Sequence, residues 1–442
     1  MSNPTLDRLS LSGRTRSWTA RDEVRRGFSL FLLMVVLAVV TGPDGSQAEP
    51  YSGLTGSLFT ARALPYYLVG IALAVLAVVG QRAVRPAGVA VADLRQRATA
   101  LGVPKPVKVV GLVLLALLLV VYPTTLSPFW QTVLVDQMGI YVLLAVGLNV
   151  VVGLAGLLDL GYIAFFAIGA YTTAYLTDKL PVSPPFTLTP FLVFPFAVLA
   201  ALLAGIILGG PTLRLRGDYL AIVTLGFGEI VRITAVNSDA VTNGPQGAFG
   251  IPHFELFGYK WTLDSLPYYY LLLVVVVAIV FFFRRLDDSR VGRSWAAIRE
   301  DEVAAAATGI PTLRFKLLAF AIGASTSGFA GVIYASKVGF INPDNFPLLL
   351  SILVLTMVIF GGMGNIYGVI LGAAVLGWLP NLLKDYVPAT DRFIYFGALL
   401  VVMMIFRPQG LIPSKRRARE IRLSEAGVGG ADGLGVTPGA QT

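Results

Sequence analysis

The stretch Arg284–Lys316, RRLDDSRVGRSWAAIREDEVAAAATGIPTLRFK, decides how the rest of the chain is interpreted. It lies between two long apolar runs. The run before it, Leu266–Phe283, has no charged residue, and the run after it, Leu317–Gly339, has only Lys337 near its far end. An apolar run of about 20 residues is long enough to cross a membrane. The pattern therefore predicts a polar loop that joins two membrane spans.

Within this loop, Ser294–Thr308 has the composition of a helix, and Gly309 with the following Ile310-Pro311 is a typical helix stop. At helical spacing three apolar residues fall near one side, and a charged cluster lies beyond them: Trp295, Ile298 and Val303, then Arg299, Glu300, Asp301 and Glu302. Such a helix on a membrane protein's cytoplasmic side suits the docking of a soluble partner. The alternative is a surface helix that only links two spans.

Composition restricts the class of protein. The chain has 442 residues, of which 56% are hydrophobic and 13% charged, whereas a soluble domain carries about 25% charged residues. It is therefore predicted to be an all-α polytopic membrane protein. The net charge of +9 is mainly an orientation signal, because basic residues accumulate on the cytoplasmic face. This positive charge is not interpreted as nucleic-acid binding, because the sequence has no nucleic-acid-binding motif. The absence of cysteine excludes disulfides and thiolate sites, and the single histidine, His253, forms no histidine metal cluster by itself.

Apolar runs predict about twelve transmembrane helices, with the N- and C-termini both cytoplasmic. The predicted spans are Phe28–Val40, Leu64–Gly80, Val109–Val121, two helices within Met138–Leu176, Phe191–Gly209, Leu220–Ala235, Leu266–Phe283, Leu317–Gly339, Leu348–Phe360, Ile366–Leu383 and Phe393–Phe406. The double run is split by a glycine break at Gly153, Gly156 and Gly161. In this arrangement every loop rich in Arg and Lys falls on one side, as the positive-inside rule requires.

Four parts follow from this order: a basic cytoplasmic N-terminus (1–26), an N-terminal extra transmembrane region (27–137), a core (138–411) that contains the loop 284–316, and a basic, then disordered, cytoplasmic tail (412–442). Ser46-Gln47-Ala48 resembles a small-x-small cleavage site. The polar region before it is long for a signal peptide, so an uncleaved anchor is preferred.

Small residues at four-residue spacing predict close helix packing. They form three rows: Gly323, Ser327, Gly331 and Ala335; Gly364, Gly368 and Gly372; and Gly205 with Gly209. Such rows serve ordinary packing or, in a transporter, sliding surfaces.

Polar residues within the spans are candidates for a translocation path. Glu229 and Arg232 lie three apart on one helix face, and a charge at that depth is costly unless it is paired or faces water. The alternative is a structural pair near the membrane boundary. Asn149 is a weaker candidate, and the alternative is that its side chain only forms a hydrogen bond to a neighbouring helix. Asp159 and its glycines suggest a broken helix whose exposed amides meet a substrate carboxylate. Lys337 is expected to snorkel outward.

Several catalytic motifs are missing. The chain has no G-x-x-x-x-G-K-[ST] phosphate loop, no G-x-S-x-G elbow and no H-E-x-x-H. If transport is driven by ATP, the ATPase must be another polypeptide, and the loop 284–316 offers it a place to act.

Five segments resemble the branched-chain amino acid ABC transporter permeases of the LivM type. They are GLNVVVGLAG at 147–156 continuing to FFAIGAY at 165–171, LRLRGDYLAIVTLGFGEIVR at 213–232, GRSWAAIREDE at 292–302, GGMG at 361–364 and RPQGL at 407–411. The resemblance covers residues 138–411, and the segment 213–232 is its most specific part.

The resemblance implies the fold of an ABC importer permease in a bacterial cytoplasmic (inner) membrane. It implies a heterodimer with a sister permease, two cytoplasmic ATPase subunits that use ATP, and an extracytoplasmic substrate-binding protein, with no cofactor bound by this chain. The segment Ser294–Gly309 becomes a coupling helix, whose candidate residues are Arg293, Trp295, Ile298, Arg299, Glu300, Glu302 and Gly309. Glu302 and Gly309 are seven apart, which departs from the usual EAA-glycine spacing. The outward loop Asn237–Pro252 would face the binding protein, through Asn243, Gly244, Pro245 and Gly247.

The sequence therefore predicts a permease subunit that imports branched-chain, hydrophobic amino acids by ATP-driven alternating access. One alternative is a related permease for urea or short amides, and a more distant one is an ion-coupled secondary transporter acting alone. A membrane-embedded enzyme is disfavoured because no catalytic constellation occurs.

Overall fold

The computed structural model describes residues 117–213, 215, 217–256, 258–262, 264–382, 397, 401, 403 and 410–412. Every element named below belongs to one compact unit, residues 120–383 with 407–442. Four predicted spans lie wholly or mostly outside the described residues: Phe28–Val40, Leu64–Gly80, Val109–Val121 and Phe393–Phe406. The basic N-terminus, residues 1–26, and the tail beyond residue 412 lie outside them as well.

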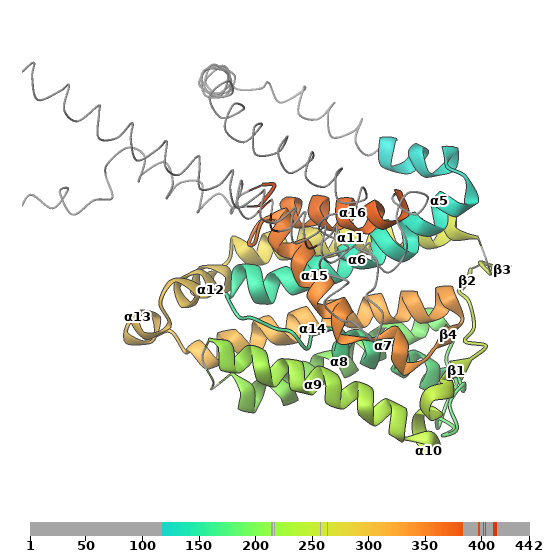
Figure 1. Cartoon of the computed structure of the whole chain (residues 1–442), viewed down its shortest axis with the longest axis horizontal. Coiled ribbons are helices and arrows are strands. Elements are labelled where there is room, and N and C mark those ends of the chain that lie inside the picture. The colour runs from blue at the N-terminus through green and yellow to red at the C-terminus, as the bar shows by residue number, and fades with distance from the viewer. Residues whose placement is uncertain are drawn as a thin grey trace, which may run out of the picture. The chain divides into compact units, whose positions relative to one another are not determined.

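The described unit is mainly helical (Figure 1). Its α-helices are α5 (Pro128–Val133), α6 (Ile140–Leu148), α7 (Ile163–Leu176), α8 (Pro190–Thr212), α9 (Asp218–Asn237), α10 (Asp239–Thr242), α11 (Ser265–Asp287), α12 (Arg290–Glu300), α13 (Glu302–Ala307), α14 (Thr312–Val338), α15 (Leu348–Gly361) and α16 (Ile366–Leu382). Short 3-10 turns are η1 (Tyr122–Thr125), η4 (Gly244–Gln246) and η5 (Pro343–Asn345), and two π-helical segments are η2 (Leu134–Gly139) and η3 (Asn149–Leu154).

Six helical segments are long and apolar enough to cross a membrane: Pro128–Leu154, Pro190–Thr212, Tyr219–Asn237, Ser265–Asp287, Thr312–Val338 and Pro343–Gly361. Two shorter apolar helices, Ile163–Leu176 and Ile366–Asn381, complete the set. Each matches one of the spans that the sequence predicts between Met138 and Leu383. The apolar runs therefore located the membrane helices of the described region correctly.

The first of these spans is one continuous helix made of α5, η2, α6 and η3. It begins at Pro128, so the predicted core boundary at Met138 falls inside it. Two of its turns are π-helical, a rare conformation that often marks functional positions in helices. After Leu154 the predicted glycine break is present, with Gly156 at φ +74°, and α7 follows. A left-handed residue ends the helix, and glycine adopts that conformation without strain from a Cβ.

Helix α14 lies at the centre of the unit and packs against α6, α7 and α8. Its small residues allow this contact, because a Cβ on Gly331 would lie only 2.6 Å from the amide nitrogen of Ala170 and one on Gly205 of α8 only 2.8 Å from Ala324. The predicted row on α14 is therefore a packing face. The row at Gly364, Gly368 and Gly372 is only partly correct. Gly364 (φ +82°) lies in the turn before α16, because its left-handed backbone cannot continue a helix.

The polar segments gather at two opposite ends of the bundle (Figure 1). Helices α12 and α13 connect α11 to α14 at one end. At the other end, β1 (Ala248–Phe249) pairs antiparallel with β4 (Phe340–Ile341), and β2 (Glu255–Leu256) pairs with β3 (Tyr259–Lys260). The β1–β4 pair joins the loop after α9 to the chain after α14. One end therefore consists of two short helices, and the other contains two short antiparallel strand pairs.

Candidate functional site

The polar loop between α11 and α14 contains two helices where the sequence predicts one. The predicted helix Ser294–Thr308 is interrupted at Asp301, which is extended with φ −155° and ψ 110°. Its carboxylate accepts hydrogen bonds from Val303 N (2.8 Å) and Ala304 N (3.0 Å) and so caps α13. Because an aspartate satisfies free N–H groups at a helix start, the chain begins a new helix here. Ser289 caps α12 in the same way.

The interruption changes which side chains are buried. Trp295 and Ile298, both candidates for contact with the ATPase, are buried within the chain, and the Trp295 indole donates to the carbonyl of Phe315 at 2.7 Å. Val303 is 60% exposed, so its predicted place beside them is wrong. The turn at Asp301 rotates α13 and takes Val303 off the face that α12 presents to the bundle. The loop is therefore anchored by α12.

A buried ion pair fastens α13 to α14. Glu302 lies 2.5 Å from the Lys316 ammonium, whose side chain is only 3% exposed. The carboxylate predicted to face a partner therefore has a partner within its own chain. Lys316 was missed because, next to the apolar start of α14, it looked like an ordinary loop charge.

The other predicted coupling residues divide into two groups. Arg293, Glu300 and Gly309 are exposed, and Gly309 has φ +86° as its helix-stop role requires. Arg299 is exposed as well, but its guanidinium reaches back to its own chain and donates to the carbonyl of Gly153 at the end of η3. Thus only part of the predicted set is presented to the outside.

Glu229 and Arg232 form the predicted pair on α9, with 2.6 Å between carboxylate and guanidinium. Their side chains are 34% and 29% exposed, respectively. A third member, Asp344 of η5, lies 3.5 Å from the other guanidinium nitrogen. Asp344 was missed because it lies more than 100 residues after Arg232 in the sequence and belongs to a short turn. Its neighbour Pro343 signals a turn but does not indicate a contact with Arg232.

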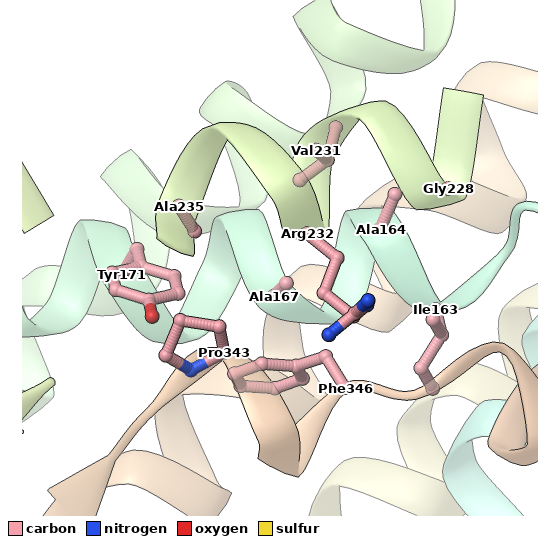
Figure 2. Close-up of a pocket in the computed structure, with 10 residues that line it drawn as sticks. All are labelled: Ile163, Ala164, Ala167, Tyr171, Gly228, Val231, Arg232, Ala235, Pro343 and Phe346. Carbon is pink, nitrogen blue, oxygen red and sulfur yellow. The ribbon is translucent and has the colours of Figure 1, made fainter. Parts of the chain in front are cut away.

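A small pocket lies beside this pair (Figure 2). It holds about 230 Å³ of space between atoms, including open space at its mouth. The guanidinium of Arg232 and the rings of Phe346 and Tyr171 border it, as do the small residues of α7 and Gly228 of α9. The pocket walls come from α7, α9 and the η5 region, and they surround one charged group, the Arg232 guanidinium, with mainly apolar side chains.

Asn149 lies at the first residue of η3 and is fully buried. Its side-chain oxygen accepts a hydrogen bond of 2.9 Å from the amide of Gly364, before α16. This contact is the neighbour bond that was the alternative to a translocation role.

Asp159 is also fully buried, and its carboxylate accepts from the amide of Gly161 at 2.9 Å. The adjacent amide of Leu160 donates to Thr224 of α9 at 3.1 Å. Other N–H groups of the break donate within the protein as well: Ala155, Leu157 and Ile163. These amides are occupied rather than exposed in this conformation, and a translocation role for Asp159 stays a prediction.

The prediction that Lys337 snorkels outward is wrong. The residue is buried, with 7% of its surface exposed. Its ammonium donates to the Ser265 hydroxyl at 2.9 Å and lies 5.1 Å from the ring centroid of Tyr268. A hydroxyl and an aromatic face stabilise the cation inside the bundle, so it has no need to reach the membrane surface.

The loop predicted to face a binding protein has a defined structure. Asn243 is left-handed (φ 63°), and its amide group donates to the carbonyl of Gly247 at 2.7 Å. Gly244 and Gly247 are buried, whereas Pro245 is exposed. Pro245 is therefore the residue of the predicted set that presents its surface outward.

Farther along the same end of the bundle, the hydroxyl of Tyr259 donates to Asp264, and this hydrogen bond raises the pKa of Tyr259.

Within the described residues, no three Asp, Glu, His or Cys side chains come together as a metal site. His253 is used structurally, since its Nδ1 lies 2.7 Å from the carbonyl of Ser336. The candidate site therefore consists of two parts: the α12–α13 loop, and the Glu229–Arg232–Asp344 group with its neighbouring pocket.

Comparisons with known proteins agree with this architecture. The family described as branched-chain amino acid transport system permease component matches residues 132–407. The chain is 41% identical to the high-affinity branched-chain amino acid transport system permease protein LivM of Salmonella typhimurium over 309 residues, 65% of this chain and 71% of the relative. It is 24% identical to a probable LivM of Methanocaldococcus jannaschii, over 61% of this chain and 84% of that protein.

A shorter similarity extends to a second kind of permease. The chain is 32% identical over 124 residues to the LivH permease protein of Salmonella typhimurium, covering 28% of this chain and 40% of LivH. No solved structure matches the chain significantly.

Proposed function

This chain belongs to the family of branched-chain amino acid transport system permease components, and we propose that it is the transmembrane subunit of an ATP-driven importer of branched-chain, hydrophobic amino acids. The observation that carries the proposal is the family match over residues 132–407 together with the identity to LivM proteins. The multi-pass helical architecture supports it, since six segments are long and apolar enough to cross a membrane. The chain is thus a transport subunit and not an enzyme.

ATP is hydrolysed on two separate cytoplasmic subunits that act on α12 and α13. Support comes from the sequence, which has no phosphate-binding loop, and from the position of the two helices at one end of the bundle (Figure 1). The exposed side chains Arg293 and Glu300 face the partner, while Trp295 and Ile298 hold α12 to the membrane helices. This end is cytoplasmic in the proposed topology of twelve spans.

A sister permease and an extracytoplasmic binding protein complete the importer in a bacterial cytoplasmic membrane. The similarity to LivH supports a related sister subunit. The opposite end of the bundle, with Pro245 and the exposed ring of Phe249, faces the binding protein. Phe249 stacks on Phe340 at 4.4 Å between ring centroids, which fixes this surface to the end of α14.

Helix α9 lines the path between this subunit and its sister. A charged pair that is about one-third exposed is costly against lipid, so protein or water must cover that face. Replacing Glu229 with Gln removes the charge but keeps the shape. We expect correct assembly and at least a tenfold loss of leucine uptake. Normal assembly with normal uptake contradicts a path role for Glu229.

The test of the proposed function is leucine uptake by the full complex in proteoliposomes. The permease pair, the ATPases and the binding protein are reconstituted, and radiolabelled leucine is followed with and without ATP inside. Uptake that requires ATP and the binding protein supports the proposal. Uptake that follows an ion gradient and ignores the ATPases identifies a secondary transporter. ATP turnover stimulated by a binding protein loaded with urea or a short amide, without leucine transport, keeps the architecture and changes the substrate.

A further inference from the structure

Arg299 connects the α12 helix to the end of the first membrane span. Its guanidinium donates to the carbonyl of Gly153, the fifth residue of the π-helical segment η3. The last carbonyls of a helix have no partner within the helix and carry its negative dipole end. The preceding carbonyls of Val150 and Val151 accept from Ala155 and Leu157, whereas that of Gly153 accepts from an arginine 146 positions away. A cation from another helix therefore completes this helix end.

Two left-handed glycines provide the space for this side chain. A Cβ on Gly156 (φ +74°) would lie 2.6 Å from Cγ of Arg299, and a Cβ on Gly364 (φ +82°) would lie 3.0 Å from its Nη1. The arginine thus passes over Gly156 and ends beside Gly364. Both positions need glycine for conformation and for space.

The same contact reaches the turn before α16. The amide of Gly364 donates to the Asn149 side chain at 2.9 Å, and a Cβ on Gly153 would lie 2.5 Å from that Gly364 amide nitrogen. The turn before α16, the end of η3 and the tip of Arg299 are therefore joined by two hydrogen bonds.

On its other side, α12 is fixed to α14. The Trp295 indole donates to the Phe315 carbonyl, and Trp295 is fully buried. The α12 helix is therefore bonded to α14 through Trp295 and to the end of η3 through Arg299. The hydrogen bond to η3 comes from a single long side chain.

We propose that Arg299 is a positioning residue that makes α12, the π-helical end of the first span and the turn before α16 move together. This inference rests on the proposed function and goes beyond it, because Arg299 acts on its own chain rather than on the ATPase. When the ATPases displace α12, the arginine transmits the displacement to η3. Without it, α12 still moves α14 but leaves the first span behind.

The test compares leucine transported with ATP hydrolysed in the reconstituted complex. Arg299→Ala is expected to lower leucine transported per ATP at least tenfold, while Arg299→Lys, which keeps a cation for the Gly153 carbonyl, retains more than half. Arg314→Ala removes an exposed arginine of the α14 start and serves as the control with an unchanged ratio. A merely structural role lowers the amount of assembled complex but leaves this ratio unchanged.

The outcomes separate this inference from the proposed function. An unchanged ratio in Arg299→Ala beside a wild type that couples normally overturns the role of Arg299 alone. A wild type that moves no leucine with ATP contradicts the proposed function, and the inference falls with it.

Discussion

The two polar ends of the bundle are held together by different chemistry. At the α12–α13 end, charged and polar side chains make the decisive contacts: Ser289 and Asp301 cap helices, Glu302 pairs with Lys316, and Arg299 bonds a helix end. At the opposite end, backbone pairing is added to side-chain bonds such as that of Asn243 to Gly247. The β1–β4 pair and glycines with positive φ, such as Gly244 and Gly247, set the path of the chain.

This difference indicates how each end responds to force or substitution. Side-chain contacts transmit a displacement through a few atoms, and each is removed by one substitution. Backbone pairing and left-handed glycines distribute their effect over a loop and hold one shape. The first arrangement suits an element that is pushed, and the second suits a surface that must keep its shape. The following stability predictions test this contrast, beginning with the largest effect.

Glu302→Ala is expected to destabilise the protein by about 3 kcal/mol, because it leaves the buried ammonium of Lys316 without its carboxylate. The measurement is the thermal unfolding of purified protein in detergent. Glu300→Ala, an exposed acid on the preceding helix, is the matched control and is expected to change stability by less than about 0.5 kcal/mol. Equal effects of the two variants show that the ion pair does not hold this end together.

Gly247→Ala tests the opposite end and is expected to cost about 2 kcal/mol. Gly247 has φ 73° and ψ −165°, a region essentially restricted to glycine. A Cβ there would also lie 2.1 Å from the carbonyl oxygen of Ile341.

The matched control is Gly250→Ala. Gly250 has a similar φ of +70°, but a Cβ there would meet nothing within 4 Å. It is expected to cost about 1 kcal/mol, from backbone strain alone. The same unfolding measurement distinguishes the two variants. If Gly250→Ala is as harmful as Gly247→Ala, the β1–β4 contact is not what fixes this loop.

Asp301→Ala is expected to have the smallest effect, about 1 kcal/mol, because it removes the cap of α13. Asp301→Ser keeps an oxygen that accepts from the same N–H groups and is expected to preserve most of the stability. Hydrogen exchange of the α13 amides measures the local effect. Exchange at Val303 and Ala304 that stays as slow in Asp301→Ala as in the wild type contradicts the capping role.

The sequence predicted the long apolar helices of the described region but few of their side-chain partners. Apolar runs located the six described helices that are long and apolar enough to cross a membrane, and two shorter apolar helices, because burial in lipid demands long uncharged segments. The break at Gly156 and the stop at Gly309 were also predictable, since both glycines adopt positive φ. The interruption at Asp301 was missed because a sequence of Glu, Val and Ala favours one continuous helix.

The candidate site was predictable only in part. Glu229 and Arg232 were found because they lie three positions apart on one helix, whereas Asp344 joins them from a distant turn. Lys337 was placed outside the bundle because a lone lysine near a helix end usually reaches water. Ser265 and Tyr268, which stabilise it inside, lie about 70 positions earlier in the sequence.

By itself the sequence determined the membrane class, the positions of the apolar helices in the described region and the family resemblance, because these depend on local composition and short motifs. Only the tertiary structure decided the partners of the charged residues: Glu302 with Lys316, Arg299 with Gly153, and Lys337 with Ser265. The physical reason is that hydropathy acts along a segment, whereas a buried charge is stabilised by whichever group the fold brings within a few ångströms. That group is set by packing and carries no local signal in the chain.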